Sequence, residues 1–222
     1  MFWRMLGLVV LAAMASGHAW AQEPRAEISG SAGWTLSDGV SSNGIVAADG
    51  NLYNRLDPKD SFSYGFGLGF LLSPHWELEF LWNRQSSKLE VGGTSTLEVG
   101  DLDVDNYHGV VSYNFGDSRA YTRPYIGVGA GATHYGAVGF TGFDGGSREI
   151  GGQTKFSPTF AAGLKLFAGG STGLRLGVRW TPTYIKTDAT GFWCDPYFGC
   201  YVVGDSQYSN QFEFSGGLII RF

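Results

Sequence analysis

Eight charged side chains are the residues of this sequence best placed to do chemistry. Along several short segments, large apolar residues alternate with small or polar ones, and the charged residues fall on the small and polar side of that alternation. Equal numbers of acids and bases favour mutual pairing, because a buried ion is costly unless it is paired. The pattern therefore predicts a salt-bridge network inside a closed sheet, with a narrow or gated pore as the alternative. The acids are Glu27, Glu77, Glu79 and Glu213, and the bases are Lys165, Arg175, Arg179 and Arg221.

The segments that carry these charges are predicted to be β-strands, because strict alternation gives a strand two different faces. Eight of them are expected, at 26–36, 61–72, 76–83, 106–115, 124–133, 156–167, 174–181 and 211–222. Short turns alternate with long loops, and the long loops are expected at 37–60, 87–100, 134–153 and 185–207. Short turns at one end and long loops at the other are typical of an outer-membrane barrel.

The two faces of these strands decide the class of barrel. A soluble barrel turns its large apolar face inward, but here the opposite face carries the charges and many glycines. Eight strands enclose an interior just wide enough for side chains, so polar and small residues can fill it while the aromatic face meets lipid. We therefore expect an all-β fold, an eight-stranded antiparallel transmembrane β-barrel with up-and-down meander topology; ten strands remain an alternative. The aromatic residues expected in two girdles at the membrane interfaces are Trp34, Tyr64, Trp76, Trp82, Tyr113, Trp180 and Phe222.

The first 21 residues are predicted to be a secretory signal peptide. Arg4 precedes a short apolar run, and Ala19-Trp20-Ala21 resembles a cleavage site before Gln22. No later stretch has the roughly 18 unbroken apolar residues that a transmembrane helix needs. The barrel domain is therefore assigned to residues 22–222.

Charge and cysteine content narrow the function classes further. A net charge of −5 provides no basic footprint for nucleic acid. Cys194 and Cys200 are the two cysteines, and in an exported chain they are expected to form a disulfide that closes a short loop. A metal site built on these two residues is the alternative, but no histidine or third cysteine lies nearby in the sequence.

Three sequence motifs carry a resemblance to a known family. The strand Pro124-Tyr125-Ile126-Gly127-Val128-Gly129, the strand end Tyr113-Asn114-Phe115 and the terminal Leu218-Ile219-Ile220-Arg221-Phe222 resemble those of the outer membrane protein A-like small β-barrels. The resemblance covers essentially the whole chain after residue 21. It implies that Phe222 is the C-terminal signal for the barrel-assembly machinery. Because the chain stops at Phe222, the periplasmic peptidoglycan-binding domain of the larger members is expected to be absent.

An enzymatic role is not expected. Some eight-stranded barrels are lipid A deacylases or acyltransferases, which need a nucleophilic serine oriented by a histidine and an acid. Those deacylases carry a His-x-Ser pair, and none of His75, His108 and His134 begins one. His108 is instead expected to be a hydrogen-bonded lumen residue.

Three alternating acids are candidates for a surface contact with cations. Asp101, Asp103 and Asp105 share one face of a predicted strand that projects as a hairpin turning at Gly92-Gly93. Carboxylates there could bind divalent cations that bridge lipopolysaccharide phosphates, since hard cations take oxygen ligands. A solvated strand extension is the simpler interpretation.

The sequence thus predicts a monomeric protein of the outer membrane of a Gram-negative bacterium, with no cofactor. Its lumen is expected to be plugged, its long loops to face the outside, and its role to be structural or to lie in surface interactions. A small channel for ions or solutes is the alternative. The expected partners are outer-membrane lipid, lipopolysaccharide and the barrel-assembly machinery.

Overall fold

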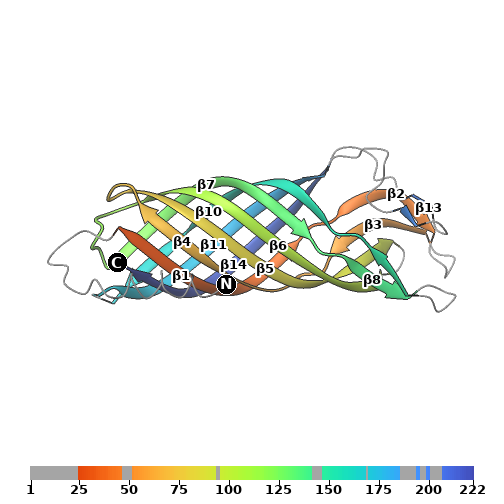
Figure 1. Cartoon of the computed structure of the whole chain (residues 1–222), viewed down its shortest axis with the longest axis horizontal. Helices are drawn as coiled ribbons and strands as arrows, with labels where there is room; N and C mark the ends of the chain where they lie inside the picture. Colours follow the sequence, from red (N-terminus) through yellow and green to blue (C-terminus); the bar gives the residue numbers. More distant parts are fainter. Residues whose placement is uncertain are drawn as a thin grey trace, which may run out of the picture.

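The chain folds into a closed antiparallel barrel of eight long strands (Figure 1). The computed structural model describes residues 25–46, 52–93, 96–141, 147–168, 170–185, 194–195, 199–200 and 207–222. The barrel strands are β1 (Ala26–Ser37), β4 (Ser61–Leu71), β5 (Trp76–Gly93), β6 (Thr96–Asn114), β7 (Thr122–Tyr135), β10 (Gln153–Phe167), β11 (Thr172–Ile185) and β14 (Gln207–Arg221). Each pairs with the next barrel strand along the chain, and β14 returns to β1. The predicted eight-stranded meander is confirmed.

No helix with the length and apolar character needed to cross a membrane occurs among the described residues. The predicted signal peptide, residues 1–21, lies outside them.

The strands of the barrel are strongly staggered. Following the paired residues once around the barrel from Ala26 leads back to the same strand at Leu36. Such a stagger goes with strands that tilt against the barrel axis, as closure requires. All the backbone hydrogen bonds between neighbouring strands are then made within the wall, which a lipid environment demands.

The four long connections were predicted to be loops, with a projecting hairpin in 87–100, and the structure adds strand segments in the other three. They contain strand segments, namely β2 (Val40–Val46), β3 (Leu52–Pro58), β8 (Val138–Thr141), β9 (Ser147–Ile150), β12 (Cys194–Asp195) and β13 (Gly199–Cys200). β5 and β6 also run on through 87–100 as the predicted hairpin, and β3 pairs with the end of β5. The sheet therefore has ten strands while the barrel closes with eight. In the described segments, these strands pair with one another or with β5.

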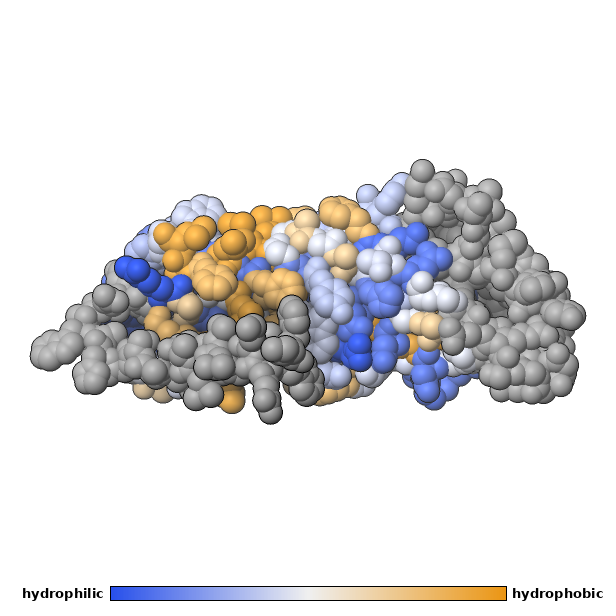
Figure 2. Space-filling model, in the orientation of Figure 1, coloured by the Kyte–Doolittle hydropathy of each residue, from blue (hydrophilic) through white to orange (hydrophobic). Residues whose placement is uncertain are grey.

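The alternation of the sequence separates the two faces of the wall. Large apolar side chains are exposed on the outside, as at Phe66, Val128 and Leu176, whereas acids and bases are buried inside, as at Glu27 and Lys165. Figure 2 shows the apolar side chains as a band on the half of the barrel that holds the C-terminus, with hydrophilic side chains beyond it. This inversion of the usual core is what a lipid-facing barrel requires.

Close contact between β6 and β7 depends on a glycine, which gives a first prediction. A Cβ at Gly131 would overlap the carbonyl oxygen of Tyr107, whereas a Cβ at the neighbouring Gly109 would meet nothing closer than 4.0 Å. We expect Gly131→Ala to lower the free energy of unfolding by roughly 1–3 kcal/mol, as overpacking does, and Gly109→Ala to leave it nearly unchanged. Denaturant titration of the refolded variants in lipid vesicles measures both, and equal effects would contradict the predicted asymmetry.

Candidate functional site

The lumen holds most of the predicted charged residues, and they are arranged in layers along the barrel. At the end with the short turns, Lys165 lies between two carboxylates. Its Nζ atom is 2.6 Å from Glu77 Oε2 and also contacts Glu27 Oε2. Asn114 donates a further hydrogen bond to Glu77 at 2.8 Å. All of these side chains are buried, so each carboxylate has a cationic partner where unpaired charge would be costly.

Tyr125 fills the lumen directly above this Lys165 layer. Its ring lies between two cations, with Lys165 Nζ 5.6 Å and the Arg175 guanidinium 4.8 Å from the ring centroid. The guanidinium of Arg175 forms a two-point ion pair with Glu79 and donates from Nε to the Tyr125 hydroxyl at 3.1 Å. Gly163 and Gly177 make room, since a Cβ there would lie 2.7 Å and 2.8 Å from Tyr125 atoms.

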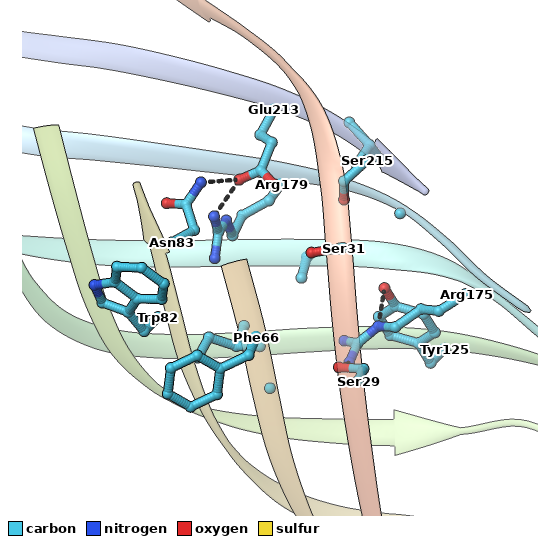
Figure 3. Close-up of a pocket in the computed structure, with 15 residues that line it drawn as sticks. Ser29, Ser31, Phe66, Trp82, Asn83, Tyr125, Arg175, Arg179, Glu213 and Ser215 are labelled. Carbon is cyan, nitrogen blue, oxygen red and sulfur yellow. Dashed lines mark hydrogen bonds and ion pairs between the residues drawn. The ribbon is translucent and has the colours of Figure 1, made fainter. Parts of the chain in front are cut away.

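The ion pair between Arg179 and Glu213 lies above that between Arg175 and Glu79, and a small cavity lies between the two pairs. Arg179 pairs with Glu213, which also accepts a hydrogen bond from Asn83 at 3.0 Å (Figure 3). Between the Arg175 and Arg179 pairs remains a cavity of about 40 Å³. At roughly 10–15 Å³ for each water, it has room for about three water molecules.

Uncharged polar side chains continue the filling beyond the second pair. Asn106 donates to Asn83 and Gln211 and accepts from Thr133, and His108 lies 2.9 Å from the Ser157 hydroxyl. The next layer toward the long connections is apolar and buried. It consists of Leu89, Leu102, Val104, Tyr135 and Val138.

Arg221 was predicted to join the charge network, but the structure places it elsewhere. No carboxylate of the described chain lies at ion-pair distance from its guanidinium. Arg221 instead donates to the carbonyl oxygens of Ser118 at 2.7 Å and Gly170 at 3.2 Å, and it stacks on the Phe167 ring at 3.8 Å. Arg221 stands opposite Glu27 in the β1–β14 ladder, but Lys165 binds that carboxylate, and the Arg221 side chain reaches the short turns from the end of β14.

Arg123 is a lumen base that the sequence analysis missed. It is fully buried, its Nη1 lies 3.7 Å from Glu27 Oε1, and its Nη2 donates to the Pro74 carbonyl at 2.6 Å. This strand was predicted to begin at Pro124, two residues after its actual start at Thr122. Extending the alternation from Tyr125 back by two positions would have placed Arg123 inside. The lumen thus has five bases for four acids.

The three alternating acids of β6 lie on the outer face, where they meet bases of β5. Arg84 holds Asp105 at 2.7 Å and reaches Asp103 at 3.9 Å, and Lys88 is paired in register with Asp101. Within the described ranges, no group of three acids, histidines or cysteines is arranged to hold a metal ion. The geometry therefore shows an ion-paired strand extension, and a cation contact remains only a prediction.

Charged side chains continue on this outer face along the hairpin. Glu98 accepts hydrogen bonds from Lys59 at 2.8 Å and from Lys88 at 2.6 Å. These two ammonium groups lower the pKa of Glu98 to about 2. Glu98 therefore stays ionised and paired with these two lysines down to low pH.

For two further predicted sites, the structure shows the position of the backbone but does not test the predicted role. Cys194 of β12 stands directly opposite Cys200 of β13 in a two-stranded ladder; the disulfide itself stays a prediction. Phe222 is exposed, and its backbone N–H donates to the Ala26 carbonyl at 2.8 Å. This bond extends the β1–β14 seam to the last residue, and the role of Phe222 in assembly also stays a prediction.

Comparison with known proteins identifies the family of this barrel. The model of the outer membrane protein beta-barrel domain matches residues 7–218. The chain belongs to this outer-membrane β-barrel family. Among curated proteins, no sequence matches the chain significantly. Family membership and the filled barrel together identify an outer-membrane protein and explain why its apolar face points outward.

Solved structures of outer-membrane proteins share the fold of this β-barrel. OprG from Pseudomonas aeruginosa has a TM-score of 0.62 at 14% identity, covering 90% of this chain and 97% of that one. AlkL, solved in DMPC lipid bilayers, has a TM-score of 0.56 at 17% identity, covering 92% of this chain and 94% of that one. Neisserial surface protein A has a TM-score of 0.53 at 13% identity, covering 89% of this chain and 97% of that one. At these identities the likeness shows the fold alone.

The Lys165 layer gives the second prediction. Lys165→Met removes the cation between Glu27 and Glu77 and leaves two carboxylates buried side by side. We expect it to lower the free energy of unfolding by about 3–5 kcal/mol, the usual cost of leaving a buried charge unpaired. Adding Glu27→Gln and Glu77→Gln should recover most of that loss. Denaturant unfolding in vesicles measures both, and a harmless Lys165→Met would show that the layer is not held by charge pairing.

Proposed function

We propose that this outer-membrane barrel is a closed structural protein whose role lies in surface interactions, with no conducting path through its lumen. The carrying observation is that charged and aromatic side chains fill the lumen layer upon layer. The Lys165 layer, Tyr125, the two arginine ion pairs and the apolar layer follow one another along the axis. All four lumen acids and four of the five lumen bases have a partner of opposite sign within ion-pair distance.

Ion pairing argues for a plug rather than a selective pore. A pore that selects ions presents unpaired charge of one sign to a water-filled path. Here Glu77, Glu79 and Glu213 each bind a base directly, and the space between the two arginine pairs is only about 40 Å³. Such a cavity isolates a few waters and offers no passage for a solute.

The surface that remains for interaction is the end with the long connections. There β5 and β6 rise beyond the aromatic band with β3 alongside, and their outer face carries ion-paired side chains such as Arg84 and Lys88. In this proposal that end faces the outside of a Gram-negative bacterium, and the chain termini lie in the periplasm. Outer-membrane lipid and lipopolysaccharide surround a monomeric barrel, whose final strand with Phe222 engages the barrel-assembly machinery.

The proposal includes no catalytic role. His108 and Ser157 approach one another, but both are buried in the lumen, and His108 Nδ1 has no partner among the described residues. A serine nucleophile needs an acid to orient the histidine and a substrate that can reach it. The pair is better explained as part of the polar filling.

Conductance of the refolded chain in a planar bilayer tests this proposal. We expect no discrete current steps from the unmodified protein when folding is verified by heat-modifiable gel mobility. Tyr125→Ala should stay silent too, because the Lys165 layer and the two arginine ion pairs still fill the lumen on either side of the ring.

Ile126→Ala is the matched control, since Ile126 is the next residue of β7 and faces outward. It should stay silent. Discrete steps from the unmodified protein would favour the channel alternative over the plug. Discrete steps from Tyr125→Ala and none from Ile126→Ala would contradict the layered filling, because a single ring would then make the seal.

A further inference from the structure

Two buried arginines bind the backbone of all three short turns. Arg221 of β14 donates to Ser118 in the turn between β6 and β7 and to Gly170 between β10 and β11. Arg123 of β7 donates to Pro74 in the turn between β4 and β5. Three segments far apart in the sequence are thus tied by two side chains at the short-turn end of the lumen.

The turns close this end of the barrel as a floor. Ser118 and Phe167 are buried, and the Arg221 guanidinium covers the Phe167 ring. The backbone N–H of Phe167 donates to Tyr121 across the two turns at 2.7 Å, and that of Arg221 donates to Ser171 at 2.7 Å. The turns therefore hold each other as well as the two arginines.

This floor is held less tightly than the layers above it. Lys165, Arg175 and Arg179 each bind a carboxylate directly, whereas Arg221 binds neutral carbonyl oxygens. Hydrogen bonds between two ionised groups are stronger than those with one neutral partner. Arg123 is also incompletely satisfied, because its Nε and Nη1 atoms are buried with no hydrogen-bond partner. Regions with the weakest contacts open first in a folded protein.

We propose that Arg221 and Arg123 form a latch that holds the three turns across the short-turn end of the lumen, and that this floor opens locally while the barrel above stays closed. Arg221 is the last residue of β14, the strand that closes the barrel on β1. The latch therefore assembles only when the barrel has closed. The inference concerns the floor alone and holds whether or not the lumen conducts.

Amide hydrogen exchange of the refolded full-length chain, followed by NMR, tests the latch. The probes are the amide of Ala120, which donates to Asp117, and that of Phe167, which donates to Tyr121. Arg221→Gln should speed exchange at both sites by about tenfold or more, because charged donors are lost from both turns at once. Arg84→Gln, which removes a base of the outer face far from the turns, should leave both rates unchanged.

Three results would overturn the latch: acceleration at neither site, acceleration at one site only, or equal acceleration of the amides in the central parts of β1 and β14. The last would show that the whole barrel opens. Should Arg221→Gln fail to close the barrel, Phe167→Leu carries the same test. It removes the ring beneath the guanidinium, and the latch requires it to speed exchange at Ala120.

Discussion

Charge buried in a narrow lumen must be paired, and this constraint organises the rest of the molecule. An eight-stranded wall whose outside meets hydrocarbon has to keep its polar side chains inside, where little water is present to solvate them. Breaking a buried pair is costly because the remaining ion has nothing to replace its partner. The acids of β5 and the bases of β10 and β11 consequently meet across the barrel.

The small residues of the wall follow from the same constraint. A Cβ at Gly67 would lie 2.6 Å from Glu79 Oε1, and one at Gly163 would lie 2.7 Å from the Tyr125 ring. Long charged and aromatic side chains from one strand therefore need glycines on the strands beside it. The lumen is filled by a few large side chains that reach over bare backbone, and the glycine-rich composition of the chain is the counterpart of its buried ion pairs.

The alternation of the sequence was enough to predict the barrel, its eight strands and the inward side of each. It also placed seven of the eight charged residues in the lumen layers, because a side chain in a strand can face only one of two ways.

The alternation could not predict which acids and bases pair with one another. Arg221 shares the inward face with the others and stands opposite Glu27 in the ladder, yet its guanidinium binds carbonyl oxygens of the turns while Lys165 binds Glu27. Arg123 was missed because a proline follows it, and Tyr125 was counted as part of the alternation without its role as a filler between two cations.

A double-mutant cycle between Glu79 and Arg175 tests the central claim most directly. The free energy of unfolding would be measured in lipid vesicles for Glu79→Gln, Arg175→Met, the double variant and the unmodified chain. If ion pairing organises the barrel, each single change should lower the free energy of unfolding by about 3–5 kcal/mol. The double change should then lower it by clearly less than the sum of the two. Strictly additive costs would contradict it, because the two residues would then stabilise the barrel independently of one another.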